Sequence, residues 1–247
     1  MSFSDSHCHM DGYQPERLTE VLQETRAKQV DIMVAVAMSL ESSEEVIRLA
    51  QTHEEIVAAV GIHPWNAVPL TDDVCTSLDE LARREEVVAL GEIGLDYARS
   101  PETKEIQKEL LEYELSLALD TGLPVNIHCR EAHQDMMELL GKKAGSGLKG
   151  MAHGFSGDLA VLGDWLGLGF YISIGRTVLM DEMTALREAV PEIPLDRLLT
   201  ETDSTPRREG ASPTEVIMVA GKLASLRGMT VEEIGAAATA NLRRLLS

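Results

Sequence analysis

The sequence predicts a single-domain α/β protein of the (β/α)8 TIM-barrel class spanning residues 1–247. The chain has 247 residues, 44% of them hydrophobic, which is enough to bury one sizeable core. Eight β-rich segments alternate with segments of helical periodicity, and no proline- or serine-rich linker divides them. A doubly wound open sheet is the alternative. That fold usually has a glycine-rich turn after its first strand, whereas this chain has His7-Cys8-His9 there.

The expected strands are short apolar runs bounded by turn residues, as is typical of parallel strands buried on both faces. They span residues 3–9, 31–38, 56–62, 87–93, 124–129, 149–154, 170–175 and 198–203.

Segments between the strands carry apolar residues at helical spacing, such as Leu18, Val21 and Leu22. Three helix-start signals support these helices. Ser100 before Pro101 predicts an N-cap and first turn, Ser212-Pro213-Thr214-Glu215 predicts a capping box with proline at the first helical position, and Thr230 with Glu233 predicts the start of the last helix.

The charge balance of 22 basic and 41 acidic residues gives a net charge of -19, spread along the chain. Such a surface repels polyanions, which excludes nucleic-acid binding through a broad basic face. Activity on nucleic acid would need local positive charge from bound metal ions and a few arginines.

Composition also restricts the location and the cysteine chemistry. No apolar run approaches the roughly 20 residues of a membrane helix, and the first residues lack the pattern of a secretory signal, so the sequence predicts no membrane partner and a cytoplasmic protein. Three cysteines without C-x-x-C spacing indicate reduced thiols rather than disulfides or a thiolate zinc site.

Polar residues that bind metals stand where the expected strands end, which is the position of reactive groups in a barrel. His7 and His9 are two residues apart in an extended segment, so they share one face and can bind one cation together, while Cys8 points the other way. The other strand ends carry His63, Glu92, His128 with Arg130, His153 and Asp203.

The carboxylates at these ends follow apolar strands. Glu92 comes after the buried run 87–91, so it needs a metal ion or an ion pair to offset desolvation; Asp203 either binds a metal or caps a helix. Histidine nitrogens with carboxylate oxygens suit Zn²⁺, Mn²⁺, Ni²⁺ or Fe²⁺ better than Ca²⁺, and Mg²⁺ stays among the candidates. This donor set exceeds the need of one tetrahedral ion, which favours two divalent metal ions.

Five motifs together resemble the TatD family of metal-dependent hydrolases, and they occur in the family's order over nearly the whole chain. They are Asp5-Ser6-His7-Cys8-His9-Met10-Asp11, Gly61-Ile62-His63-Pro64, Gly91-Glu92-Ile93-Gly94-Leu95-Asp96-Tyr97, Ile127-His128-Cys129-Arg130-Glu131-Ala132 and Glu201-Thr202-Asp203-Ser204. The resemblance implies a TIM barrel with two divalent ions and hydrolysis of DNA or RNA phosphodiesters from the 3′ end.

Carried over residue by residue, the resemblance also implies a ligand set for the two ions. His7, His9 and Asp203 would bind one ion, Glu92 would bridge the two, and Glu92 and Asp203 would be the catalytic carboxylates. The second ion would be bound by His128 and His153.

The resemblance further implies that His63 and Arg130 face the substrate, where both can bind phosphate oxygens. For Asp96 the expectation is either to orient a ligand or to form a turn. Trp65 is expected to pack, with stacking on a base as the alternative. The loop 205–213 is shorter than is usual in the family, so the segment that contacts substrate differs here.

The predicted function is therefore a two-metal phosphodiesterase, a deoxyribonuclease acting on single-stranded or 3′ ends through an activated water. One alternative is hydrolysis of a small-molecule amide, ester or lactone with the same ions. Another is a catalytically inactive, metal-stabilised barrel that binds a partner.

Overall fold

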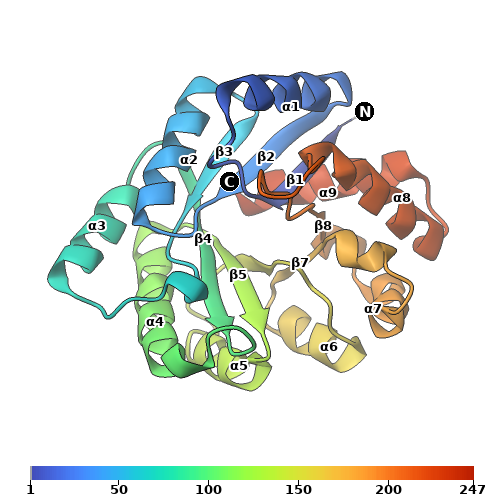
Figure 1. The fold of residues 1–247 in the computed structure, drawn as a ribbon. Coiled ribbons are helices and arrows are strands. Elements are labelled where there is room, and N and C mark those ends of the chain that lie inside the picture. Colours follow the sequence, from blue (N-terminus) through green and yellow to red (C-terminus); the bar gives the residue numbers. More distant parts are fainter. Residues whose placement is uncertain (1) are drawn as a thin grey trace. The chain divides into compact units, whose positions relative to one another are not determined.

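The structure is a computed structural model that describes residues 2–247, and strands alternate with helices along the chain (Figure 1). Eight strands form a sheet in which the strand order follows the chain from β1 to β8. Every strand pairing described below is parallel. This is the element order and strand order of a (β/α)8 barrel, so the predicted fold class is confirmed. The chain folds as two compact units.

The first unit contains the chain up to Ala35 and the segment His153–Leu245. Strand β1 pairs with β2, and β7 pairs with β8. The side chains of β1, β7 and β8 are buried throughout, so these strands form the core against which the helices pack. The elements are β1 (Phe3–Cys8), α1 (Pro15–Ala27), β2 (Val30–Val36, whose last residue belongs to the second unit), α6 (Leu159–Gly167), β7 (Tyr171–Ile174), α7 (Thr184–Ala189), β8 (Leu198–Thr200), α8 (Val216–Arg227) and α9 (Val231–Leu245).

The second unit is the continuous segment Val36–Ala152. Strand β4 pairs with β3 on one side and with β5 on the other, and β5 pairs with β6. The elements are α2 (Leu40–Thr52), β3 (Ile56–Val60), α3 (Asp72–Ala82), β4 (Val87–Asp96), α4 (Lys104–Thr121), β5 (Val125–Arg130), α5 (His133–Lys142) and β6 (Gly150–Ala152).

All eight strands form where the sequence predicts them, although β8 ends at Thr200, three residues before its predicted end, and β4 extends furthest beyond its prediction. It continues beyond residue 93 to Asp96, and its register against β5 runs to Asp96 opposite Arg130. The extension matters because it carries the Gly-Glu-Ile-Gly-Leu-Asp motif within a paired strand rather than in a loop.

The helix-start signals have mixed outcomes. The Thr230 and Glu233 capping box is confirmed, because each side chain accepts the backbone N–H of the other residue. Pro101 does begin a helical turn, but it is a short 3-10 helix, and the Ser100 side chain makes no cap; the Ser100 carbonyl accepts instead from Gln107 Nε2 at 2.8 Å. Within residues 2–247, no helix combines the length and the apolar character needed to cross a membrane.

The predicted capping box at Ser212 forms only in part. The Ser212 hydroxyl accepts from the backbone N–H of Thr214 at 3.3 Å, which starts the 3-10 helix Pro213–Glu215 ahead of α8. The Glu215 carboxylate does not close the box. It pairs instead with the guanidinium groups of Arg176 and Arg208. The ion pair with Arg176, which is distant in the sequence, thus replaces the local capping contact that the sequence predicts.

Candidate functional site

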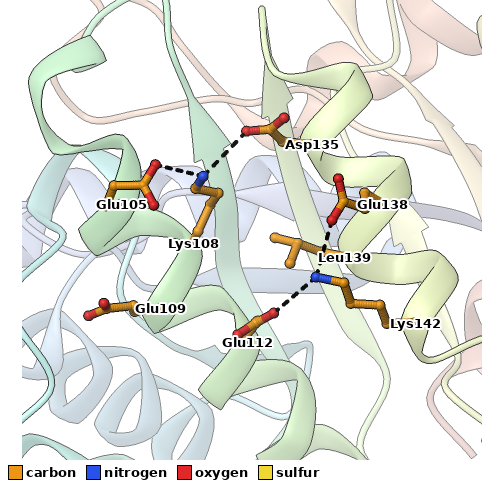
Figure 2. Close-up of a pocket in the computed structure, with 8 residues that line it drawn as sticks. All are labelled: Glu105, Lys108, Glu109, Glu112, Asp135, Glu138, Leu139 and Lys142. Carbon is orange, nitrogen blue, oxygen red and sulfur yellow. Dashed lines mark ion pairs between the residues drawn. The ribbon is translucent and has the colours of Figure 1, made fainter.

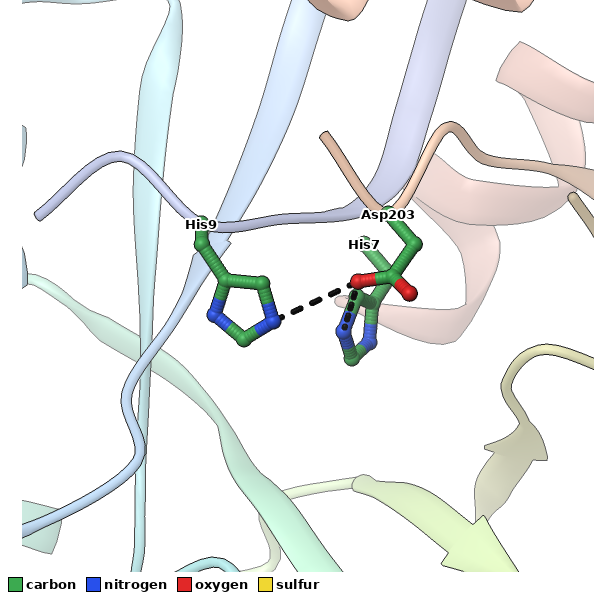
Figure 3. A group of neighbouring side chains, drawn as sticks. All are labelled: His7, His9 and Asp203. Carbon is green, nitrogen blue, oxygen red and sulfur yellow. Dashed lines mark ion pairs between the residues drawn. The ribbon is translucent and has the colours of Figure 1, made fainter. Parts of the chain in front are cut away.

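The first unit holds a group of three metal-binding side chains at the end of β1. Figure 3 shows His7 and His9 directed at the same carboxylate, that of Asp203. Asp203 Oδ1 lies 3.3 Å from His9 Nε2 and 3.8 Å from His7 Nε2. The ligand atoms of the three residues all lie within 4.8 Å of one another. The predicted sharing of one face by His7 and His9 is thus consistent with their common approach to Asp203.

Backbone pairing between β1 and the segment after β8 brings Asp203 to these histidines. Asp203 N donates to His7 O at 3.0 Å, and His9 N donates to Ser204 O at 2.8 Å. Asp203 has a positive φ of 49°, a left-handed conformation that aspartate tolerates better than most residues do. The carboxylate therefore lies beside His7, and its side chain is 56% exposed.

Asp5 holds the same segment in place, although no separate role is predicted for it from the sequence. Its carboxylate accepts from Thr202 N at 3.0 Å and from the Thr202 hydroxyl. Burial raises the pKa of Asp5 well above its usual value, although the hydrogen bonds from Thr202 oppose that rise. Asp5 is therefore a positioning residue for the segment that ends in Asp203.

His153 joins this group through ring stacking on His7, with centroids 3.6 Å apart and planes 10° from parallel. Its Nδ1 lies 3.2 Å from Glu201 Oε1, and Glu201 is fully buried. A buried carboxylate on one imidazole nitrogen orients the ring and leaves the other nitrogen for a metal. Glu201 is not among the site residues predicted from the sequence. The sequence feature that could have indicated Glu201 is its position directly after the buried strand β8, two residues before Asp203.

Cys8 faces away from the histidines, as alternation along β1 predicts. Its thiol is fully buried and donates to Val34 O at 3.6 Å on the neighbouring strand. Burial raises the pKa of Cys8 well above its usual value, with nearby carboxylates adding to the rise. The protonated thiol is thus a packing group and contributes no thiolate to a metal site.

The second unit holds a separate group made of His63, Glu92 and His128. Glu92 Oε1 lies 2.7 Å from His128 Nδ1 and 3.2 Å from His63 Nε2. Glu92 is 3% exposed, and the ligand atoms of the three residues lie within 4.8 Å of one another. The prediction that Glu92 needs compensating partners is thus met by two imidazoles.

Two glycines of the β4 motif allow Glu92 and His128 to meet. A Cβ at Gly94, whose φ is +149°, would lie 1.9 Å from the carbonyl oxygen of His128, and a Cβ at Gly91 would lie 2.6 Å from the side chain of Asn126. Only glycine fits at such distances, so β4 and β5 approach more closely here than side chains would permit.

Asp96 orients His128 from its other nitrogen and also forms a turn, so both expectations for this residue hold. Asp96 Oδ2 lies 3.1 Å from His128 Nε2 and accepts from Trp65 Nε1 at 2.7 Å, while Oδ1 accepts from Arg99 N at 2.8 Å. Burial alone raises the pKa of Asp96, but these hydrogen bonds outweigh it and hold the pKa well below its usual range. Asp96 is therefore a charged carboxylate that leaves His128 Nδ1 directed at Glu92.

The Trp65 indole N–H donates a hydrogen bond to Asp96 Oδ2, and the Arg99 guanidinium lies 4.0 Å from the centre of the Trp65 ring. These contacts fit the expected packing role. The Trp65 backbone N–H donates to His63 Nδ1 at 3.0 Å, so Nε2 carries the proton of a neutral His63. Arg130 ends β5 with an exposed side chain.

A hollow of about 220 Å³ between α4 and α5 lies in the second unit, and none of the predicted site residues lines it. Figure 2 shows its lysines already engaged: Lys108 pairs with Glu105 and Asp135, and Lys142 with Glu112 and Glu138. Exposed ion pairs of this kind contribute little to stability. The hollow is a charged helix surface rather than a site.

The donor chemistry of both groups fits divalent ions of intermediate softness. Each group combines two imidazoles with one carboxylate, and no sulfur is included. The buried partners Glu201 and Asp96 each hold the second nitrogen of a histidine, as the outer shell of metal sites does. The residues present therefore fit metal ions, whose identity and number this donor set leaves open.

Comparison with known proteins agrees with this chemistry. The family model described as TatD related DNase matches residues 4–247. The chain is 35% identical over 98% of its length to an uncharacterized metal-dependent hydrolase, YabD, from Bacillus subtilis (strain 168), covering 97% of that protein. It is 32% identical over 86% of its length to the 3'-5' ssDNA/RNA exonuclease TatD of Enterobacter lignolyticus (strain SCF1), covering 86% of that protein.

Among solved structures, the TatD homolog YjjV from Escherichia coli K12 superposes with a TM-score of 0.89 at 30% identity. The match covers 98% of this chain and 97% of that one. The family model, the relatives and the solved structure agree with the metal-binding character of the histidine and carboxylate groups. The chain belongs to the TatD-related family of metal-dependent hydrolases.

Proposed function

We propose that this protein is a divalent-metal-dependent phosphodiesterase that acts on single-stranded or 3′ ends of nucleic acid. The observation that carries the proposal is the pair of donor groups, His7 with His9 and Asp203, and Glu92 with His128, the latter beside His63. The relative named as a 3'-5' ssDNA/RNA exonuclease supports the nucleic-acid substrate. Two divalent ions at such groups would lower the pKa of water and stabilise charge on the phosphoryl oxygens.

Asp203 is the proposed proton acceptor of the reaction. Its carboxylate is more than half exposed, so a water molecule can reach it, and Oδ1 already lies within 4 Å of two imidazole nitrogens. A carboxylate in this position can hold a proton taken from the attacking water and release it to solvent.

Glu92 and the remaining histidines complete the proposed ligand set. The assignment of Glu92 as a bridge, and of His153 with His128 to the second ion, stays a prediction from the family resemblance. The described contacts support the orientation of each ligand, because Asp96 positions His128 and Glu201 positions His153.

His63 and Arg130 are the proposed contacts to the scissile phosphate. His63 Nδ1 accepts the Trp65 N–H, so Nε2 is the donor nitrogen, and Nε2 lies 3.2 Å from Glu92 Oε1. A phosphate oxygen would therefore take the place of Glu92 on this nitrogen or share its proton. Arg130 contributes an exposed guanidinium at the end of β5, and guanidinium groups bind phosphate oxygens in a bidentate manner.

The test compares linear single-stranded DNA labelled at its 3′ end with circular single-stranded DNA of the same composition. We expect release of labelled nucleotides from the linear strand, no cleavage of the circle, and loss of activity after exhaustive chelation with recovery on adding Mg²⁺, Mn²⁺ or Zn²⁺. RNA, an aryl phosphodiester, lactones and amides complete the panel. Turnover of a lactone or amide without any phosphodiester cleavage would assign the chain to the other hydrolase class, and activity that survives chelation would rule out the metal-dependent reaction.

A further inference from the structure

A cavity of about 460 Å³ lies in the first unit, beside the proposed proton acceptor Asp203. Its wall comes from two segments that follow neighbouring strands: Arg176, Thr177, Leu179 and Met180 after β7, and Asp203 and Arg208 after β8. The volume falls within the roughly 300–1,000 Å³ of sites that take small molecules.

The side chains of Arg176 and Arg208 are both held by one carboxylate, that of Glu215. Glu215 accepts from Arg208 Nη1 at 3.4 Å and pairs with Arg208 Nη2, while its Oε1 lies 3.6 Å from Arg176 Nε. One carboxylate thus faces two guanidinium groups, so this trio keeps one positive charge, while the carboxylates of Glu201 and Asp203 line the rest of the cavity. Glu215 fixes both side chains, and the donors that it does not use can bind an anion.

Two buried oxygen atoms in the same wall also lack partners. Among the atoms of residues 2–247, neither Thr177 Oγ1 nor Glu201 Oε2 finds a hydrogen bond, although both atoms are buried. Glu201 itself is 0% exposed. Buried polar atoms without partners are costly in a folded protein. A ligand that brings a hydroxyl or amine donor, as well as an acceptor for the threonine hydroxyl, would satisfy both.

The remaining wall is apolar. Leu179 lies there, and Met180 is 47% exposed, an unusual degree for so large an apolar side chain. A flexible thioether side chain adapts to the flat face of a ring. The cavity thus combines two guanidinium groups, the carboxylates of Glu201 and Asp203, and an apolar surface.

We propose that this cavity is a subsite for a nucleoside monophosphate group, the terminal nucleotide of the substrate or the released product. Arg176 and Arg208 bind its 5′-phosphate, which in the substrate is the scissile phosphate that His63 and Arg130 are also proposed to contact. The sugar hydroxyl meets the buried polar atoms, and the base lies on Leu179 and Met180. The choice of a nucleotide rests on the proposed phosphodiesterase function, whereas the anion-binding role of the arginines rests on the cavity alone. A site for one nucleotide also explains how an acidic protein could select ends over long strands.

The test measures binding of deoxyadenosine 5′-monophosphate to the chelated, metal-free protein by calorimetry, with deoxyadenosine and inorganic phosphate as comparison probes. We expect Arg176→Gln and Arg208→Gln each to weaken nucleotide binding by about tenfold, the equivalent of about 1.4 kcal/mol, as for one charge-assisted hydrogen bond. Binding of deoxyadenosine should be weaker than that of the nucleotide and unaffected by either change.

Arg207→Gln is the matched control, because Arg207 is exposed on the same loop and does not line the cavity. It should bind the nucleotide as the unaltered protein does, and circular dichroism should show all three variants folded. Equal binding by the unaltered protein, Arg176→Gln and Arg208→Gln would overturn the subsite, as would tighter binding of deoxyadenosine than of its phosphate, or no nucleotide binding up to millimolar concentration.

The outcome is separable from that of the proposed function. Arginine-dependent nucleotide binding without any phosphodiesterase activity would keep the subsite and reject the reaction. Phosphodiesterase activity with unchanged KM in both arginine variants would keep the reaction and reject the subsite. Where both hold, the variants should raise KM for linear single strands far more than they lower kcat.

Discussion

Glu92 is the residue whose charge the proposed chemistry needs most. Its side chain is buried, and its Oε1 lies within 3.2 Å of two imidazole nitrogens. Glu92→Gln preserves the shape but removes the charge, so we expect activity to fall on the order of 100-fold and metal content to drop, while the melting temperature changes little. Elemental analysis alongside the nuclease assay measures both quantities.

Glu114→Gln is the matched control for that variant, since Glu114 is another buried glutamate of the second unit and lies outside the predicted ligand set. It should keep its metal content and its activity. A Glu92→Gln variant that binds the same amount of metal and turns over normally would show that Glu92 is no ligand.

Glu114 carries a pH dependence of its own. Burial raises the pKa of Glu114 well above its usual value, although its Oε1 accepts from Ile62 N at 2.9 Å. Because the folded pKa exceeds the unfolded one, the stability that the protonated carboxyl contributes is complete below the unfolded pKa and is lost as pH rises toward the folded pKa.

Glu114→Gln keeps an acceptor for Ile62 N and removes this loss. The variant should therefore gain free energy of unfolding over the unaltered protein as pH rises from about 4, by roughly 1.4 kcal/mol for each unit that burial adds to the pKa. Urea unfolding at pH 4 and pH 8 measures the difference. A difference that is the same at both pH values would mean that Glu114 does not titrate differently in the folded state.

At the scale of elements, the approach of β4 to β5 decides the geometry of the second donor group. Alanine at Gly94 would place a Cβ 1.9 Å from the backbone of β5, and backbone atoms cannot move aside as a flexible side chain can. We expect Gly94→Ala to destabilise the protein by several kcal/mol, roughly 3 or more, and to separate Glu92 from His128.

Gly122→Ala provides the control, because Gly122 also has a positive φ, +75° at the end of α4, but no atom lies within 4 Å of its added Cβ. The variant should lose only the free energy of unfolding that corresponds to left-handed backbone strain, about 1–2 kcal/mol. Thermal unfolding of both variants measures the two costs. Equal costs would show that the close approach to β5 contributes nothing beyond the strain of the backbone.

At the scale of the whole molecule, the charge of -19 limits how nucleic acid can be bound. If Arg130, Arg176 and Arg208 all contact the one scissile phosphate, the slope of log affinity against log salt for a single strand should be only about 0.7 in magnitude, since each phosphate contributes roughly 0.7. Fluorescence anisotropy with a labelled oligonucleotide over a salt series measures it. A slope of about 5 or more would indicate a long basic track that the composition excludes.

Features that depend on neighbours along the chain could be predicted without the structure. Alternation along β1 put His7 and His9 on one face and Cys8 on the other, and the Thr230 and Glu233 pair began α9 where expected. The strand pattern gave the barrel class for the same reason, because side-chain periodicity is a local property that survives in any register.

Which distant groups meet could be learned only from the folded chain. It placed Glu201 on His153 and Asp96 on His128, and it turned Glu215 from its expected capping role to two arginines. These contacts depend on strand register and on which loops share a strand end, and a shift of one residue would exchange every side chain between faces. Local periodicity carries no information about register between distant strands, so the metal-binding residue types were predictable and the residues that hold them in place were not.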